Sequence, residues 1–201
     1  MREASPSCPA IRRRSSSSGF AAMTADRPLL PAAFLDRDGV INRDFGYVHS
    51  IEQFEFLPGA IKAMKALHDA GFQLVVVTNQ SGIGRGYYSE AQFAQLTDEM
   101  TRMLQQHGVP LAGVFYCPHA PSLDGESTCD CRKPMPGMIL EAAQSLRLDL
   151  NRSILVGDKA SDIDAGIAAG VARCFAVGTN GTLGHNYVDL GAVASDVLRA
   201  R

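Results

Sequence analysis

The sequence contains no tryptophan, and only 7% of its 201 residues are aromatic. It also lacks an excess of either charge, because the formal net charge is -2 at pH 7. A nucleic-acid surface combines a basic face with stacking aromatic rings, so this composition argues against nucleic acid as a partner. No apolar run approaches the roughly 20 residues that a membrane-spanning helix requires. We therefore expect an ordinary globular chain that acts on a small molecule and does not contact a membrane.

The N-terminal stretch lacks the apolar segment of a secretory signal. Three arginines at 12–14 are followed by four serines at 15–18 and then by glycine. We predict that residues 1–28 form a disordered extension, with Met23 as an alternative start, and that residues 29–201 form a single domain. Without an export signal the expected location is the cytoplasm, where cysteine side chains stay reduced. We expect the protein to be a monomer.

Apolar segments alternate along the chain with amphipathic ones. We predict strands in the run that ends at Leu35 and at 72–77, 114–116, 153–157 and 173–177. The predicted helices cover 60–70, the segment from a capping box at Ser89 to Gly108, 136–146, a segment from a cap near Ser161 to Gly170, and 189–198. This alternation predicts an α/β fold, a Rossmann-like parallel sheet flanked by helices.

Polar residues follow three of these strands at the points where the strands end. They are Asp36 and Asp38, Thr78 and Asn79, and Asp158 with Asp162 one helical turn further on. Taken alone, Asp36 and Asp38 could equally belong to an Asp-rich turn. In a parallel sheet, however, all three ends meet at one edge, and we expect Arg132 and Lys133 to join them there. Clustered carboxylates need a counterion, and this set of oxygen ligands suits Mg²⁺.

Such a site is suited to phosphoryl transfer. A carboxylate beside Mg²⁺ can attack phosphorus and form an aspartyl phosphate, which divides one difficult hydrolysis into two easier steps. A second carboxylate two residues on can protonate the leaving oxygen and then activate water. Asp36 and Asp38 suit these two roles.

These residues resemble the four motifs of the haloacid dehalogenase superfamily over roughly residues 30 to 185. The matching segments are Asp36-Arg37-Asp38-Gly39, Thr78-Asn79, Lys133, and Gly157-Asp158-Lys159 with Asp162. The resemblance implies that Asp36 is the nucleophile and Asp38 the acid/base, whose backbone carbonyl also reaches the metal. It implies that Thr78 and Lys133 hold the phosphoryl group and that Asp158 completes the Mg²⁺ shell. Asp162 would orient that shell from behind.

Three of the five cysteines lie near a histidine. Cys117 and His119 precede Cys129 and Cys131 by a short loop, which offers three thiolates and one imidazole. In a reducing compartment this set favours a structural Zn²⁺ site over disulfides or coincidence, because four protein ligands leave no position for substrate. Zinc would then order the loop that presents Arg132 and Lys133.

Within the superfamily, the zinc loop and the segments around it resemble the histidinol-phosphate phosphatase-like subfamily, which includes sugar bisphosphate phosphatases. The resemblance implies a small sugar bisphosphate as substrate, a minimal cap and an open pocket. The substrate contacts that it implies are Asp44, Phe45, Gly46, Tyr47, Thr78, Asn79, Gln80, Ser81, Arg132, Lys133 and Lys159. Phe45 stands where a polar residue is expected, and Lys159 could instead cap a helix.

Three other functions remain open at this point. Histidinol phosphate is the alternative substrate within the same subfamily. A zinc-stabilised binding module without turnover would have no need of Asp36, Asp38, Lys133 and Asp158 together. A polynucleotide phosphatase would need a basic groove, which the slightly acidic composition does not favour.

Overall fold

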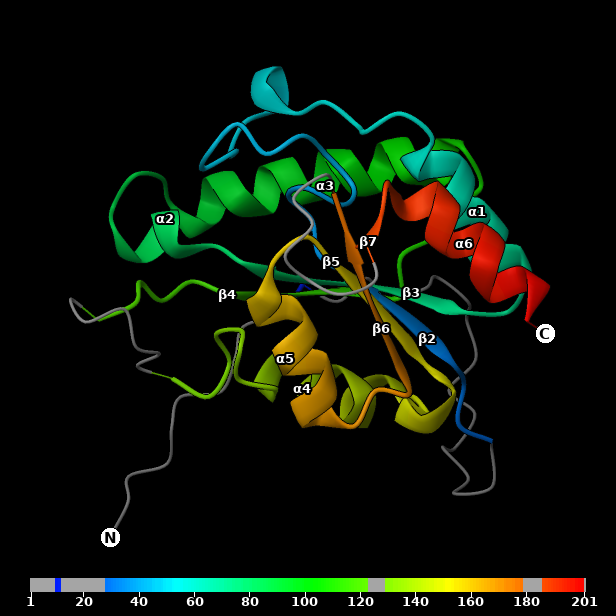
Figure 1. Ribbon diagram of the computed structural model, residues 1–201. Helices are drawn as coiled ribbons and strands as arrows, with labels where there is room; N and C mark the ends of the chain where they lie inside the picture. Colours follow the sequence, from blue (N-terminus) through cyan, green and yellow to red (C-terminus); the bar gives the residue numbers. More distant parts are fainter. Residues whose placement is uncertain (1–9, 12–27, 123–128, 179–185, 201) are drawn as a thin grey trace, which may run out of the picture.

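The structure is a computed structural model that describes residues 10–11, 28–122, 129–178 and 186–200. Within these ranges, seven strands form one sheet in the order β1-β4-β3-β2-β5-β6-β7 (Figure 1). The five central strands are parallel to one another. They are β2 (Ala32–Leu35), β3 (Gln73–Asn79), β4 (Gly113–Cys117), β5 (Ile154–Gly157) and β6 (Arg173–Val177). The predicted parallel sheet is therefore confirmed, with small shifts at the strand ends.

Two short edge strands were not predicted from the sequence. β1 (Ala10–Ile11) pairs antiparallel with β4, and β7 (Asn186–Tyr187) pairs parallel with β6. Two residues are too few to show a period-two pattern, so neither strand has a signal of its own. β1 falls within the stretch that was predicted to be disordered, and almost all of the rest of that stretch lies outside the described residues.

Helices cover both faces of the sheet (Figure 1). One face carries α1 (Ala60–Asp69), α3 (Glu90–Gln106) and α6 (Leu190–Arg199), and the other carries α4 (Gly137–Leu146) and α5 (Ala160–Ala169). The short helix α2 (Ser81–Gly84) follows β3, and two 3-10 turns, η1 (Ile51–Gln53) and η2 (Leu150–Arg152), complete the described elements. No helix among the described residues is long and apolar enough to cross a membrane.

The first central strand is buried on both sides. Ala33 and Leu35 pack into the core under α1, α3 and α6, whereas Ala32 and Phe34 pack into the core under α4 and α5. Removing the ring of Phe34, which is fully buried, would cost about 3–5 kcal/mol of stability. This two-sided burial explains the continuous apolar run, and it fixes where the carboxylates that follow the strand emerge.

The helix starts agree with the sequence in two cases and differ in one. The capping box at Ser89 is present, and Asp189 caps α6 through the Ala192 N–H. The expected cap near Ser161 is wrong, because α5 begins at Ala160 with Lys159 as its N-cap residue. There the Asp162 side chain accepts a hydrogen bond from the Lys159 N–H at 2.9 Å. The start of α5 is therefore tied directly to a residue of the predicted site.

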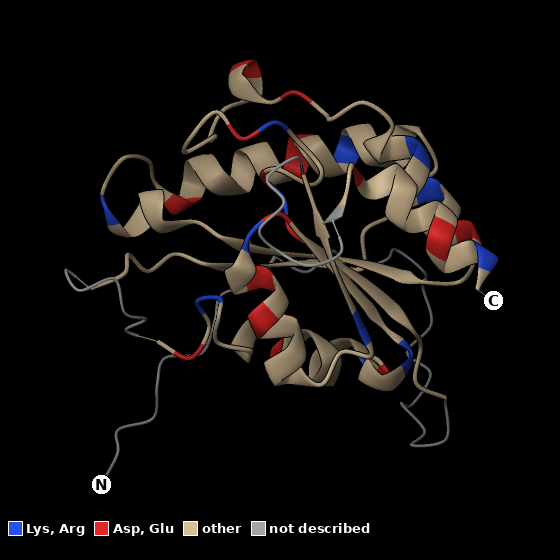
Figure 2. Cartoon of the chain, in the orientation of Figure 1, with Lys and Arg blue, Asp and Glu red and all other residues tan. Residues whose placement is uncertain are grey.

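Basic and acidic residues are interspersed along the outer helices (Figure 2). On α1, for example, Lys65 pairs with Asp69 one turn later. This mixed pattern agrees with the small net charge of the sequence.

Candidate active site

A pocket of about 470 Å³ opens at the carboxyl ends of the central strands. Because β3, β2 and β5 are adjacent and parallel, the residues that follow them meet at one edge of the sheet, as predicted. The described residues that line the pocket are Asp36, Asp38, Asp44, Gly46, Tyr47, Thr78, Asn79, Gln80, Ser81, Tyr88, Pro121, Arg132, Lys133, Pro134, Lys159, Ser161 and Asp162. Of the expected substrate contacts, only Phe45 is not among them, and its side chain is 62% exposed.

Asp36 lies at the floor of this pocket beside the ammonium group of Lys133. The Lys133 Nζ is 2.9 Å from Asp36 and 2.6 Å from Asp162, and it donates to the Val77 carbonyl at 2.8 Å. Burial and the neighbouring carboxylates raise the pKa of Asp36 to about 7, against the opposing charge of Lys133. Burial alone would lower the pKa of Lys133, but Asp162 and Asp36 raise it. The lysine thus stays charged and holds the nucleophile candidate in place.

Three carboxylates form a group that could hold a metal ion. Asp36, Asp158 and Asp162 each offer an oxygen atom within 4.8 Å of the others. The Oδ1 atom of Asp158 is buried and has no hydrogen-bond partner, so it is available to a cation. Gly39 permits this approach, because a Cβ atom there would lie 2.4 Å from the Asp158 Oδ2 atom. Clustered acidic oxygens with one buried unpaired atom fit a divalent cation such as Mg²⁺.

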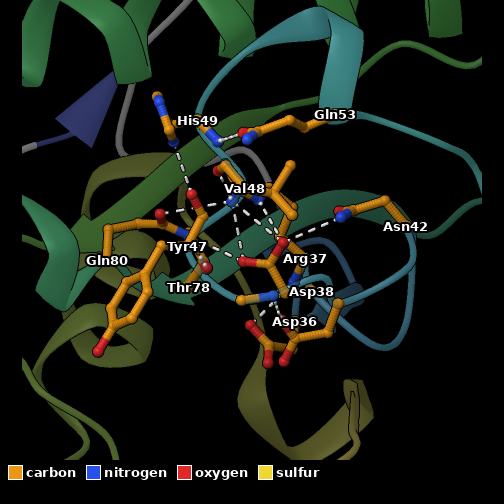
Figure 3. A network of polar contacts seen from close by, with 12 residues as sticks. Asp36, Arg37, Asp38, Asn42, Tyr47, Val48, His49, Gln53, Thr78 and Gln80 are labelled. Carbon is orange, nitrogen blue, oxygen red and sulfur yellow. Dashed lines mark hydrogen bonds and ion pairs between the residues drawn. The ribbon is translucent and has the colours of Figure 1, made fainter. Parts of the chain in front are cut away.

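Asp38 faces a different set of neighbours, all of which are N–H donors (Figure 3). Arg37 donates to both of its oxygens from Nη2 at 3.0 and 2.9 Å, and Asn42 donates to Oδ1 at 2.9 Å. Gln80 donates to Oδ2 at 3.1 Å. Arg37 is only 1% exposed and also donates to the Val48 carbonyl at 2.7 Å. Sequence reasoning missed Arg37 and Asn42, although both stand within four residues of Asp38.

Thr78 and Asn79 end β3 and have different contacts. The Thr78 hydroxyl accepts a hydrogen bond from Gln80 at 2.8 Å and lines the pocket. The Asn79 amide instead binds the backbone of Lys133 twice, donating to its carbonyl and accepting from its N–H, each at 3.1 Å. Asn79 therefore fixes the loop that carries the lysine.

Two cations and one carboxylate lie nearer to the pocket entrance. Lys159 is 56% exposed at its side chain and lies 3.3 Å from Asp44, which joins the start of α5 to the loop after β2. Burial opposes this charge on Asp44, but the Gly46 N–H and Lys159 lower its pKa. Arg132 donates to the His119 carbonyl at 3.3 Å, so its position depends on the cysteine-containing loop. Tyr47 lines the same entrance in a left-handed backbone conformation with φ of 53°.

The predicted zinc ligands come together into one cluster. Cys117, His119, Cys129 and Cys131 place their ligand atoms within 4.8 Å of one another, and the three cysteines are free thiols. The Cys129 sulfur lies 3.6 Å from that of Cys117 and 3.3 Å from that of Cys131. The Cys117 sulfur lies 3.5 Å from the His119 Nδ1 atom. Tetrahedral Zn²⁺ with bonds of about 2.3 Å places its sulfur ligands about 3.8 Å apart, so the cluster fits this ion closely. Burial also raises the pKa of Cys117 to about 12, which a bound cation would offset.

Sequence comparisons place the chain among known phosphatases. A profile of haloacid dehalogenase-like hydrolases matches residues 20–170. The chain is 54% identical over 145 residues to D-glycero-beta-D-manno-heptose-1,7-bisphosphate 7-phosphatase of Escherichia coli K12. This match covers 71% of the chain and 76% of the Escherichia coli protein. The chain is 52% identical over 150 residues to the enzyme of the same name from Pasteurella multocida, covering 74% and 82%.

The fold is similar to that of a solved phosphatase structure. D,D-heptose 1,7-bisphosphate phosphatase from B. bronchiseptica, crystallised with magnesium and phosphate, superposes with a TM-score of 0.77. It is 35% identical, and the match covers 86% of this chain and all of that one.

Proposed function

The chain belongs to the haloacid dehalogenase-like hydrolase family, and we propose that it removes the 7-phosphate of D-glycero-D-manno-heptose 1,7-bisphosphate to give heptose 1-phosphate. The observation that carries this proposal is the joint placement of Asp36, Asp38 and Lys133 in one pocket that two further cations border. We place this step in the supply of ADP-heptose for the lipopolysaccharide core, in the cytoplasm and in a monomeric enzyme.

The reaction divides into two displacements at phosphorus. A carboxylate oxygen of Asp36 attacks the 7-phosphoryl group, the bond to the sugar oxygen breaks, and Asp38 gives that oxygen a proton. Asp38 then takes a proton from water, which attacks the aspartyl phosphate and releases inorganic phosphate. Lys133 holds Asp36, and the Thr78 hydroxyl is placed to donate to a phosphoryl oxygen. Mg²⁺, when bound by Asp36, Asp158 and the Asp38 backbone carbonyl, would supply charge neutralisation at the transferring group.

The cations near the entrance support a substrate with a second anionic group. Arg132, Lys133 and Lys159 all line the pocket that contains Asp36. Among these three cations, Lys133 is the one that forms an ion pair with Asp36. A planar guanidinium suits a phosphate or neighbouring hydroxyl groups. Histidinol phosphate carries a cation at its distal end, so this arrangement favours heptose bisphosphate, as do the names of the relatives reported above.

The Cys/His cluster supports a structural role for zinc in this function. Arg132 and Lys133 directly follow Cys131, and Arg132 donates to the carbonyl of His119. Zinc bound by the four side chains would hold this loop, and with it the two cations, at the pocket wall.

A panel of phosphate-release assays tests the proposal. The substrates are both anomers of heptose 1,7-bisphosphate, histidinol phosphate and a 3′-phosphorylated oligonucleotide, each with Mg²⁺ present. We expect kcat/KM for one heptose anomer to exceed that for histidinol phosphate by at least about a hundredfold, with the product keeping its 1-phosphate. A preference for histidinol phosphate, or no turnover of either heptose anomer by zinc-loaded protein, would overturn the assignment.

A further inference from the structure

The side-chain amide of Gln80 is completely occupied by protein groups. It is 2% exposed, and its nitrogen donates one hydrogen bond to Asp38 and one to Thr78. Its oxygen accepts a hydrogen bond of 2.5 Å from the Tyr88 hydroxyl and a longer one of 3.4 Å from Arg37. An amide has two N–H donors and one oxygen with two lone pairs, so nothing remains for a substrate. Gln80 therefore connects protein groups, although it lines the pocket.

The direction of these hydrogen bonds follows from the chemistry of Asp38 (Figure 3). The Asp38 oxygens accept from the N–H groups of Arg37 and Asn42, and the Gln80 group that faces them is likewise the NH₂ and not the oxygen. The Gln80 oxygen must then face the Tyr88 hydroxyl, which donates to it. Burial raises the pKa of Tyr88 to about 12, which keeps this hydroxyl protonated across the physiological range. Since Thr78 accepts from Gln80, its own proton is free to be donated into the pocket.

Tyr88 is itself held firmly in place. It is 5% exposed, and its ring stacks on that of His49 with centroids 4.9 Å apart and an interplanar angle of 3°. Gly82 leaves the space for it, because a Cβ atom there would lie 2.1 Å from the Tyr88 ring. The neighbouring Tyr87, by contrast, is 58% exposed. The hydroxyl of Tyr88 thus reaches Gln80 from a rigid ring, and a rigid donor can fix which way an amide faces.

We propose that Tyr88 and Gln80 are positioning residues for the phosphatase reaction: the Tyr88 hydroxyl fixes the Gln80 amide, whose two N–H groups hold Asp38 and Thr78 in their working orientations. This inference rests on the proposed phosphatase chemistry, in which Asp38 protonates the leaving oxygen. It assigns to the Tyr88 hydroxyl a role in the reaction that is exerted through Gln80, to which it donates. Gln80 becomes the link between the proton donor and the hydroxyl that binds the phosphoryl group.

The test uses two aryl esters that differ in how much they need a proton donor. Nitrophenolate leaves without a proton, whereas phenolate leaves much better with one, so kcat/KM for phenyl phosphate depends more strongly on Asp38. Tyr88→Phe keeps the ring and its stacking on His49 and removes only the hydroxyl. We expect it to lower kcat/KM for phenyl phosphate about tenfold and that for para-nitrophenyl phosphate less than about threefold. An equal loss on the two esters would confine the effect to Thr78, which binds the phosphoryl group that both esters share, and would overturn the role of Tyr88 in holding Asp38.

A double-mutant cycle tests whether Tyr88 acts through Gln80. Gln80→Leu should cause a larger loss than Tyr88→Phe, and adding Tyr88→Phe to it should cause no further loss beyond about twofold. Independent, multiplicative losses would show that the tyrosine acts by another route and would overturn the proposal. Tyr187→Phe is the matched control, because it removes a hydroxyl that bonds to Asp196 on α6, away from the pocket. Thermal unfolding of each variant separates lost positioning from lost folding.

The cycle is also measured on heptose 1,7-bisphosphate. A wild-type protein that hydrolyses the aryl esters but not the heptose ester would overturn the proposed substrate while the cycle on the aryl esters still decides the role of Tyr88.

Discussion

The Cys/His cluster and the carboxylate cluster are both compact groups of metal-ligand side chains, but they differ in their relation to the pocket. The cluster of Cys117, His119, Cys129 and Cys131 supplies four ligands, and none of the described residues that line the pocket belongs to it. In the cluster of Asp36, Asp158 and Asp162, two of the three members line the pocket. Four protein ligands complete a tetrahedral zinc shell, whereas three oxygen ligands leave positions in a Mg²⁺ shell for water and substrate. The Cys/His cluster is therefore suited to a structural metal ion, and the carboxylate cluster is suited to a metal ion that takes part in the reaction.

The largest expected effect comes from breaking the carboxylate cluster alone. Asp36→Asn keeps the shape of the side chain but removes the charge that attacks phosphorus. We expect kcat to fall by at least about a thousandfold, while the protein still folds and keeps its zinc. Steady-state phosphate release and metal analysis of the same preparation check this. Near-normal turnover in pure Asp36→Asn protein would contradict a covalent aspartyl phosphate.

Breaking the Cys/His cluster should lower both the stability of the protein and its activity. Cys131→Ser removes one zinc ligand next to Arg132, so we expect loss of zinc and a decrease of about 3–5 kcal/mol in the free energy of unfolding. We also expect kcat/KM to fall by roughly a hundredfold, because the loop no longer holds the two cations. Denaturant unfolding and elemental analysis are the measurements. Cys174→Ser, at a partly buried thiol outside the cluster, is the control and should keep its zinc.

Removing Arg132 should affect substrate binding while leaving every metal-ligand side chain in place. Arg132→Ala removes a cation at the pocket wall, and we expect kcat/KM for heptose 1,7-bisphosphate to fall by roughly ten- to a hundredfold. Simple phosphomonoesters should lose less than about threefold, since they have no second anionic group. Kinetics on the two substrate types check this. Equal losses on both would instead place Arg132 at the reacting phosphoryl group.

The smallest expected effect concerns pH and Mg²⁺ in the carboxylate cluster. The folded metal-free protein raises the pKa of Asp36 from 3.8 to about 7, so folded protein binds this proton more tightly than unfolded protein does. The contribution of Asp36 to stability therefore declines as pH rises from about 4 to about 7. Mg²⁺ competes with that proton, so the increase in Tm on adding Mg²⁺ should be a few degrees larger at about pH 8 than at about pH 5.5.

A thermal-shift titration measures this difference. It should be much reduced in Asp36→Asn protein, which has no proton to release at this position. A shift that is independent of pH in the wild type would place the cation away from Asp36.

The fold and the convergence of the site could be predicted because they depend on simple patterns. An apolar run that ends in Asp36, and another that ends in Thr78, mark strand ends regardless of how the side chains turn. Parallel topology then brings those ends together, and the structure confirms it. The clustering of the cysteines could be predicted for a similar reason, since a closed metal shell requires a small number of residue types at short spacing.

The surroundings of Asp38 could not be predicted in this way. Arg37 stands between two aspartates, where a charged residue is normally solvated, yet it is almost completely buried against Val48 and Phe93 from other segments. Tyr87 and Tyr88 are identical in type and adjacent in sequence, but one is exposed and the other buried. The backbone conformation of the segment after β3 decides which of the two side chains is buried. The hydrophobic pattern of the sequence does not indicate it.

The ammonium group of Lys133 touches Asp36, near the beginning of the domain, and Asp162, well into its second half. During synthesis on the ribosome, the nucleophile therefore emerges long before the groups that hold it. A chain that stops growing before α5 would carry Asp36 and the Cys/His cluster but could not complete the pocket. Because Asp162 lies on α5, we expect hydrolytic activity only from a chain that extends through this helix.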